Sequence, residues 1–220
     1  MSPERVYERW VSKGLKLVFK LLYHQFAWAY DTVAWIVSLG MWKDWVMSVL
    51  PFIQGPKVLE LGHGPGHLLI ALQGAGHNVV GMDESREMGR LAVERLLSSN
   101  VSVLCINGYA QFMPFCNSHF DTICATFPSE YILDPTTLSE AYRVLKPGGR
   151  LVILPTAWFA RDYIPGRLVA LVYISSGQPS GLMDGYTKPL LYSGFQVSTE
   201  VRNLERSKTL VILALKPRID

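Results

Sequence analysis

Three glycines, Gly62, Gly64 and Gly66, form the chemically most informative pattern in this sequence. They follow the short run Val58–Leu61, which is apolar except for one acidic residue, and they precede a helical pattern. A loop between a strand and a helix needs residues without side chains where the chain turns tightly and a ligand approaches its backbone. Amides at the start of the helix can then face a polar or anionic ligand. The pattern predicts a ligand-binding loop, with a plain strand–turn–helix connection as the alternative.

The spacing of this loop differs from that of dinucleotide-binding loops. Those usually carry G-x-G-x-x-G, whereas Gly62–Gly66 has the pattern G-x-G-x-G. Glu60 stands two residues before the first glycine, where its charge would repel the pyrophosphate of a dinucleotide. An NAD(P)-dependent oxidoreductase is therefore disfavoured.

A second acidic residue, Asp83, ends the next apolar run, Asn78–Met82. A carboxylate at this place can accept hydrogen bonds from both hydroxyls of a ribose. NAD sites share the feature, so Asp83 alone does not separate the cofactor classes. The alternative is that Asp83 caps the helix that follows, and the two roles are compatible.

These residues depend on the elements that position them. From Lys57 onward, short apolar runs alternate with helical patterns, which predicts βαβ units and a parallel sheet with helices on both faces. The last two apolar runs are joined by the charged turn 203–208 and predict a terminal hairpin. The predicted strands are 57–61, 78–82, 101–106, 120–127, 150–154, 195–202 and 209–215, and the predicted helices are 67–73, 86–97, 138–145, 163–176 and 188–193.

Four motifs occur in order between about residues 56 and 155: ELGHGPG, GMD, FDTICATF and EAYRVLKPGGRLVIL. Together they resemble the successive motifs of class I S-adenosylmethionine (SAM)-dependent methyltransferases, and the terminal strand pair extends the resemblance to the C-terminus. The chain is most similar to the small-molecule branch that includes quinone-biosynthesis C-methyltransferases, because FAWAYD at 26–31 resembles an aromatic–Tyr-Asp element of that branch. The resemblance implies an α/β fold: a Rossmann-like, doubly wound, seven-stranded sheet, mostly parallel with an antiparallel C-terminal hairpin strand, plus an N-terminal helical cap.

The resemblance also implies a site for SAM, with S-adenosylhomocysteine (SAH) as the product. Its residues surround the methionine part, the ribose and adenine, and the sulfonium. One departure concerns adenine: the family commonly has an acid at position 109, so here the backbone or Gln111 would contact the amine. The implied cofactor-binding residues are Glu60, Leu61, Gly62 and Gly64; Asp83, Glu84 and Met88; Tyr109, Ala110 and Gln111; Thr126 and Phe127; and Tyr30, which would close over the cofactor from the cap.

Methyl transfer from a sulfonium depends largely on proximity and alignment, and it needs a base only when the acceptor must lose a proton. The catalytic residues therefore remain undetermined, and the candidates are His63, Tyr30 and Tyr131. For His63, a local packing or capping role is the commoner alternative. No His/Asp cluster in the sequence resembles a magnesium site, so no metal is expected.

Aromatic residues gather in the N-terminal cap and in the segment that follows the fifth predicted strand. Apolar walls with few polar groups suit a small lipophilic or aromatic acceptor, methylated at O, N or C. Each of these residues has a place in the core as its alternative role. They are Tyr23, Phe26, Trp28, Trp35 and Trp42 in the cap, and Trp158, Phe159, Tyr163 and Tyr173 in the later segment.

The composition favours a single globular domain without disulfides. The chain has 220 residues, 49% of them hydrophobic and 18% charged. We expect a helical cap over 1–55 and a methyltransferase domain over 56–220, with an apolar insertion at about 156–186. Three cysteines without a CxxC pair predict neither a disulfide framework nor a zinc site, which suits the cytoplasm. A net charge of +3 does not predict a nucleic-acid partner.

The first 22 residues form a basic pattern at helical spacing. Such a helix can lie on an anionic membrane surface, and a solvated face on a packed helix is the alternative. Peripheral membrane contact would fit a lipid or quinone substrate. A phospholipid N-methyltransferase therefore stays open as an alternative. So does a SAM-binding protein without catalysis, because binding and turnover use different residues. The sequence does not determine the oligomeric state. The basic residues are Arg5, Arg9, Lys13, Lys16 and Lys20.

Overall fold

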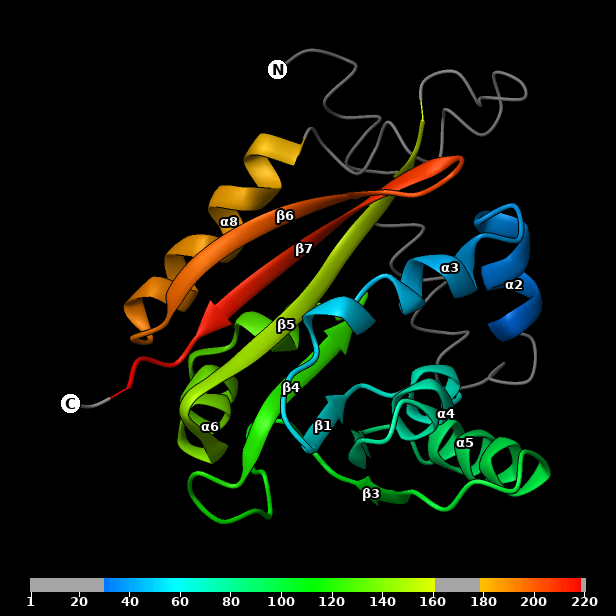
Figure 1. The fold of residues 1–220 in the computed structure, drawn as a ribbon, viewed down its shortest axis with the longest axis horizontal. Helices are drawn as coiled ribbons and strands as arrows, with labels where there is room; N and C mark the ends of the chain where they lie inside the picture. The colour runs from blue at the N-terminus through cyan, green and yellow to red at the C-terminus, as the bar shows by residue number, and fades with distance from the viewer. Residues whose placement is uncertain (1–29, 161–178, 219–220) are drawn as a thin grey trace.

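A computed structural model describes residues 30–160 and 179–218 of the chain (Figure 1). Seven strands form one sheet in the order β3-β2-β1-β4-β5-β7-β6. The first five are mutually parallel, whereas β7 runs antiparallel to both of its neighbours, β5 and β6. This topology confirms the predicted fold class. The strands are β1 Lys57–Leu61, β2 Asn78–Asp83, β3 Leu104–Asn107, β4 Phe120–Thr126, β5 Leu145–Phe159, β6 Gln196–Asn203 and β7 Ser207–Leu215.

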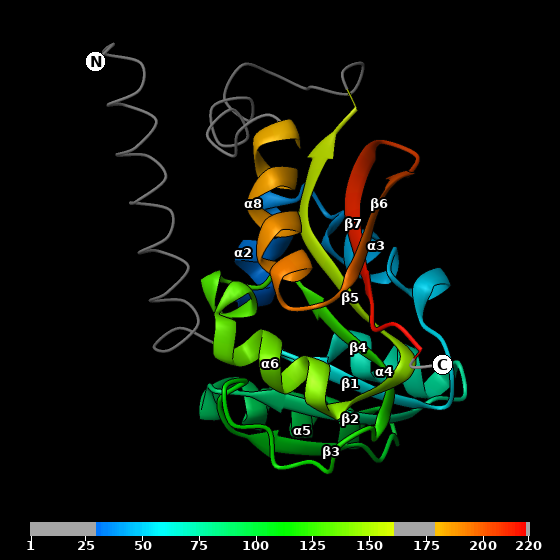
Figure 2. The ribbon, with the colours of Figure 1, turned by 90° about the vertical axis from the view of Figure 1, so that its left-hand side faces the viewer.

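Helices cover both faces of the sheet. Successive residues of a strand point to opposite faces, so Val58 packs in one apolar cluster with α3, α4 and α5, and Leu59 packs in another with α6 and α8. Figure 2 shows α6 and α8 on one side of the sheet and α3 and α4 on the other. The helices are α2 Tyr30–Val37, α3 Trp42–Met47, η2 Leu50–Phe52, α4 His67–Gly74, α5 Arg86–Ser98, η3 Glu130–Leu133, α6 Pro135–Val144 and α8 Pro179–Tyr192.

The described part of the cap packs directly on the sheet domain. Val46 and Val49 of the cap belong to the same buried cluster as Val58 of β1 and the leucines of α4. The indole Nε1 of Trp45 donates a hydrogen bond to Ser207 Oγ at 2.8 Å. In the described ranges no single helix has the length and apolar character to cross a membrane, although the bent pair Asp31–Val37 and Trp42–Phe52 reaches the threshold when taken together.

Strand β5 is longer than its prediction at both ends. The sequence Lys146–Gly149 reads locally as a turn, but the structure includes it in β5 as an irregularity: Leu145 pairs with Phe120 of β4 and Arg150 pairs with Thr122. Gly148 has a φ of +80° and its amide donates to the Lys216 carbonyl, which compensates for the interrupted pairing. At the other end, β7 continues to pair with β5 as far as Phe159, so the predicted insertion does not begin at 156.

Helix α8 is also longer than predicted. The predicted helix begins at residue 188, whereas α8 begins at Pro179. Proline is tolerated in the first turn, where its missing N–H would have no helical partner. The predicted helix 163–176 lies outside the described residues, as do the first 22 residues with their basic pattern.

Candidate cofactor-binding site

The carboxyl ends of β1, β2 and β4 lie side by side at the point where the strand order reverses. Ligands of open α/β sheets bind in the crevice at such a point. The predicted residues at the ends of these strands, Glu60, Asp83 and Thr126, are therefore brought to one edge of the sheet. The fold thus places the glycine loop and its acidic partners where a cofactor would bind.

The glycine loop requires its glycines for different reasons. The φ values of Gly62, Gly64 and Gly66 are +67°, +51° and +84°. Positive φ values are unfavourable for residues that have a Cβ atom. A Cβ at Gly62 would lie 2.6 Å from the Tyr131 hydroxyl oxygen, whereas a Cβ at Gly64 would meet no heavy atom within 4 Å. The loop is therefore tightly packed at its start and open at Gly64, where a ligand can approach the backbone.

Asp83 connects the glycine loop to the end of β2. Its Oδ2 accepts a hydrogen bond from Gly64 N at 2.9 Å, and its Oδ1 accepts one from Ser85 N at 2.8 Å. The cap of α5 is Ser85, whose Oγ accepts a hydrogen bond from Met88 N at 3.2 Å. The alternative that Asp83 caps this helix is therefore wrong. Asp83 instead fixes the loop at the position that the resemblance gives to a ribose-binding acid.

Glu60 is a buried carboxylate with an unused oxygen. Its side chain is 1% exposed, and Oε2 has no hydrogen-bond partner in the described part of the chain. Burial, and secondarily the charge of Asp83, raises the pKa of this carboxyl well above its ordinary value. An unpaired buried carboxylate is unfavourable unless a donor or a cation reaches it. The site therefore fits a ligand that brings a positive group, such as the amino group of a methionine.

Comparison with known proteins identifies the family. A family model described as a methyltransferase domain matches residues 58–149. A demethylmenaquinone methyltransferase of Lactiplantibacillus plantarum is 33% identical over 168 residues, which cover 66% of this chain and 70% of that protein. A ubiquinone/menaquinone biosynthesis C-methyltransferase of Blochmanniella floridana is 32% identical, over 60% of this chain and 56% of that protein. The present chain thus spans little more than half of this second relative.

The solved structure of a SAM-dependent methyltransferase from Methanosarcina mazei has the same fold. Its TM-score is 0.57 at 20% identity, and the match covers 78% of this chain and 98% of that one. The chain belongs to the class I SAM-dependent methyltransferase family. SAM is the cofactor of this methyltransferase, and when bound it supplies a methyl group already activated on a sulfonium.

Two of the candidate catalytic residues of the methyltransferase lie beside its glycine loop. His63 is buried, its Nδ1 is 2.7 Å from the Gly64 carbonyl oxygen, and burial lowers the pKa of its imidazole. Its ring fills the space above Gly81, where a Cβ would lie 2.9 Å from Cδ2. This environment matches the packing alternative, while a catalytic role for His63 stays a prediction. The Tyr30 side chain lies outside the described part of the structure.

Tyr131 comes from η3 and reaches across the loop. Its hydroxyl donates a hydrogen bond to the Leu61 carbonyl at 3.2 Å. Burial, followed by the nearby carboxylates of Asp83 and Glu60, raises the pKa of the Tyr131 phenol. The phenol therefore stays protonated and acts as a donor, which favours a positioning role over that of a base.

Tyr131→Phe is expected to lower the free energy of unfolding by about 1 kcal/mol, because one hydrogen bond to Leu61 is lost. Affinity for SAH should stay within about threefold of wild type, since a hydrogen bond of this size is worth less than one factor of ten. The pH dependence of SAH affinity between pH 8 and 10 should also be the same in the variant as in the wild type. Urea unfolding and calorimetry check this, with the exposed Tyr192→Phe as a control. A pH dependence of SAH affinity in the wild type that disappears in the variant would contradict the assignment, because it would show that the phenol titrates in this range.

The remaining predicted cofactor residues have different degrees of access. Tyr109 is 62% exposed, whereas Met88 is fully buried. Phe127 has a φ of +47°, uncommon for a large side chain, and its ring stacks on Trp42 with centroids 4.4 Å apart. The other predicted positions divide in the same way: Glu84 is exposed, Gln111 and Thr126 are half-buried, and Ala110 packs against the core.

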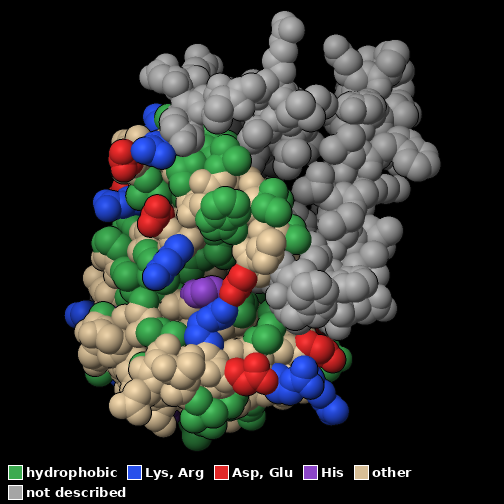
Figure 3. Space-filling model, turned by 90° about the vertical axis from the view of Figure 1, so that its right-hand side faces the viewer, with side chains coloured by type: hydrophobic (Ala, Val, Ile, Leu, Met, Phe, Trp, Pro, Cys, Tyr) green, Lys and Arg blue, Asp and Glu red, His purple; other side chains and the backbone are tan. Residues whose placement is uncertain are grey.

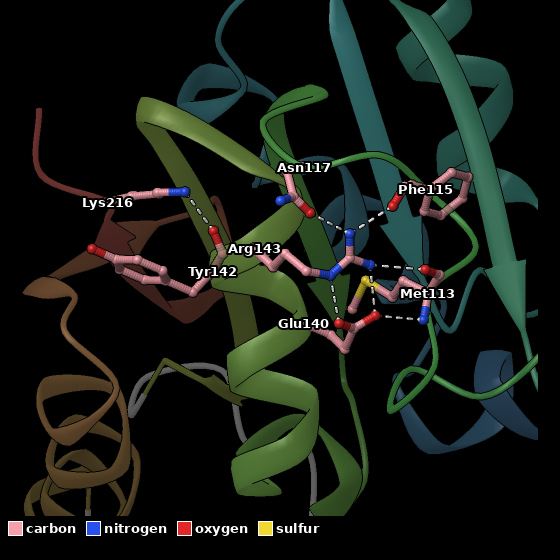
Figure 4. A network of polar contacts seen from close by, with 7 residues as sticks. All are labelled: Met113, Phe115, Asn117, Glu140, Tyr142, Arg143 and Lys216. Atoms are coloured by element: carbon pink, nitrogen blue, oxygen red, sulfur yellow. Dashed lines mark hydrogen bonds and ion pairs between the residues drawn. The ribbon is translucent and has the colours of Figure 1, made fainter. Parts of the chain in front are cut away.

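An arginine on α6, which the sequence analysis did not single out, holds the loop that carries Tyr109–Gln111 (Figure 4). Arg143 donates hydrogen bonds to the carbonyls of Met113 at 3.0 Å and Phe115 at 2.7 Å. It also pairs with Glu140, whose Oε2 accepts a hydrogen bond from Met113 N at 2.9 Å. Hydrogen bonding to Arg143 lowers the pKa of Glu140. Both residues belong to the motif EAYRVLKPGG. The motif could have drawn attention to them, but their hydrogen bonds to the loop could not be predicted from it.

Arg143→Met is expected to lower the free energy of unfolding by about 2 kcal/mol, because two carbonyls and a carboxylate lose a charged donor. Methionine keeps most of the aliphatic stem, so the loss reports on the guanidinium. Urea unfolding measures it, and hydrogen exchange should become faster in residues 108–118. The matched control is Arg90→Met on the exposed face of α5. Equal stabilities of the two variants would refute the role given to Arg143.

No metal site competes with this interpretation in the described ranges: they contain no group of three or more His, Cys, Asp or Glu side chains that could hold an ion. The free cysteines Cys105 and Cys124 lie in β3 and β4. Burial raises the pKa of the Cys105 thiol to about 11, so this thiol stays protonated at neutral pH and behaves as a small apolar side chain.

Proposed function

We propose that this methyltransferase transfers the methyl group of SAM to a small, lipophilic, aromatic acceptor of the quinone-precursor type. The support is an aromatic cluster that joins α3 of the cap to Phe127, which follows β4, and to Phe159, the last residue of β5. Phe127 stacks on Trp42, and Trp45 contacts both Phe127, with ring centroids 6.2 Å apart, and Phe159, with ring centroids 5.7 Å apart. The names of the relatives, which are demethylmenaquinone and ubiquinone/menaquinone methyltransferases, point to the same class of acceptor.

The chemistry assigned to the chain's own residues is mainly alignment. The glycine loop and Asp83 would hold the cofactor at the ends of β1 and β2. Glu60 would fix the amino end of the cofactor, and the aromatic cluster would exclude water and orient a flat ring. In-line transfer gains most of its rate from such positioning.

A substrate panel tests the proposal. The protein is incubated with SAM and either a short-chain demethylmenaquinol, a catechol or phosphatidylethanolamine, and each product is read by mass spectrometry. Addition of one methyl group to the quinol or to the phenolic ring is expected. Methylation of phosphatidylethanolamine alone would refute an aromatic acceptor and support the phospholipid alternative. Binding of SAH without methylation of any aromatic acceptor would favour the non-catalytic alternative.

We also propose that the protein works in the cytoplasm, in contact with a membrane surface. The support is the basic pattern in the first 22 residues, together with Trp35 and Ile36 of α2, which are 64% and 57% exposed. The full chain should co-sediment with vesicles that contain phosphatidylserine. Replacing Arg5, Arg9 and Lys13 by Gln should reduce the fraction of protein that sediments. Equal sedimentation of the two proteins would contradict the membrane proposal and leave the acceptor proposal unaffected.

A further inference from the structure

One guanidinium joins α2, the first of the described helices, to the middle of the glycine loop. Arg95 of α5 donates one hydrogen bond from Nη2 to Asp31 Oδ2 and another from Nη1 to the Pro65 carbonyl. Asp31 Oδ1 lies 3.0 Å from Nε2 of His67, the first residue of α4. Asp31 therefore contacts the helix that follows the loop and, through Arg95, the loop itself. Figure 3 shows the right-hand side of the molecule in Figure 1, where one histidine side chain lies next to acidic and basic side chains.

The loop is braced by α5 at a second point, next to the first. Gly66 packs so closely on α5 that a Cβ there would lie 3.1 Å from the Cβ of Ala92 and 3.2 Å from its Cα. On the opposite side, Gly64 N is held by Asp83. The loop conformation thus depends on its contacts with α5. The Asp31–Arg95 contact in turn holds α5 against α2.

The electrostatics of this contact suit a positioning role. The side chains of Asp31, His67 and Arg95 are 44%, 30% and 25% exposed. Hydrogen bonding to His67, with further contributions from the charges of His67 and Arg95, lowers the pKa of Asp31, so its carboxylate stays ionised at neutral pH. Exposed ion pairs contribute little stability. A planar guanidinium that engages a carboxylate and a carbonyl together, however, fixes the geometry of both.

We propose that Asp31 and Arg95 are positioning residues that couple the seating of α2 to the binding of SAM by the glycine loop. The inference rests on the assignment of the SAM site above and adds that α2 takes part in it. Coupling of this kind is reciprocal: if the contact favours the binding conformation of the loop, then bound cofactor must stabilise α2. A purely structural ion pair would not produce that second effect.

The test compares Asp31→Asn, Arg95→Gln and the double variant, with the exposed Arg90→Gln as the control on α5. SAH affinity is measured by calorimetry. We expect it to fall about fivefold for Asp31→Asn and about twentyfold for Arg95→Gln, which loses both contacts. The double variant should bind SAH nearly as well as Arg95→Gln, and any further loss would measure the Asp31–His67 contact. Arg95→Lys keeps the charge but not the fork, and should lie between wild type and Arg95→Gln.

Hydrogen exchange separates coupling from stability. In the wild type, SAH should slow exchange in residues 31–37, and in Asp31→Asn that slowing should disappear even where the variant is folded. SAH affinity within about twofold of wild type for both single variants, with the slowing retained, would overturn the inference while wild-type binding still supported the SAM site. Absence of SAH binding by the wild type would overturn the site assignment and this inference together. If Asp31→Asn fails to fold, Arg95→Lys carries the same comparison.

Discussion

Asp83→Ala is expected to weaken SAH binding by about a hundredfold or more. The carboxylate accepts hydrogen bonds from the backbone amides of Gly64 and Ser85, and the side chain is 2% exposed. Each hydrogen bond to a charged group is worth about 1.5–3 kcal/mol, and about 1.4 kcal/mol corresponds to a factor of ten in affinity. The variant loses the contact with the loop and, under the ribose assignment, the acceptor for the ribose hydroxyls, so both losses would act on the same binding equilibrium.

Calorimetry at neutral pH measures this loss, and Asp121→Ala is the matched control. Asp121 lies in β4 and, like Asp83, accepts a backbone hydrogen bond, from Lys57 N at 2.9 Å, but it does so at the opposite end of the sheet. The control should unfold at a lower temperature than wild type and keep its SAH affinity within about twofold. Should Asp83→Ala bind SAH as the wild type does, the ribose assignment and the role of Asp83 in the loop would both be wrong.

The parts of the site that could be predicted are those encoded by short stretches of sequence. Gly62 and Gly64 indicate a loop because tight turns favour residues without side chains. Asp83 follows an apolar run that predicts a buried strand. The order of the motifs then determines the topology, since each strand–helix unit adds its strand to the sheet in a fixed hand. For these residues, local chemistry and final structure agree.

Boundaries set by tertiary pairing could not be predicted in the same way. Lys146–Gly149 has the composition of a turn, yet it belongs to β5 because β4 pairs with Leu145 and Arg150 on either side of it. Within it, the Gly148 amide and the Gly149 carbonyl form backbone hydrogen bonds with Lys216. Phe159 lies in an apolar stretch that reads as an insertion, but β7 extends far enough to pair with it. In both places the neighbouring strand, which is distant in sequence, decides the outcome.

Contacts between side chains of separate elements were also beyond the sequence. The Asp31–Arg95 pair joins residues 64 positions apart, and periodicity carries no information on which side chains meet across such a distance. Phe127 was assigned to the cofactor through the resemblance, while its stacking on Trp42 emerged from the structure. The contact between the cap and the sheet likewise emerged from the structure, in which Val46 and Val58 share one buried cluster.

Glu60→Gln is expected to stabilise the cofactor-free protein while weakening its affinity for SAM. The folded protein raises the pKa of Glu60 well above the ordinary value of 4.5, mainly by burial and then through Asp83. Between 4.5 and the raised value, the folded state holds a proton that the unfolded state has lost, so stability falls as the pH rises. Each unit of difference between the two pKa values corresponds to about 1.4 kcal/mol. Glutamine has no proton to lose, so the variant should avoid this decline.

Thermal unfolding without cofactor, measured from pH 5 to pH 9, should therefore show the variant gaining on the wild type as the pH rises. The exposed Glu94→Gln on α5 serves as the control and should follow the wild-type curve. SAH binding should be weaker in Glu60→Gln by about tenfold to a hundredfold, because a neutral amide would replace the carboxylate that we expect to bind the cationic amino group. A variant that is more stable but binds SAH poorly would show that Glu60 serves ligand binding at the expense of stability. A variant less stable than the wild type at pH 8 would instead show that Glu60 serves the fold.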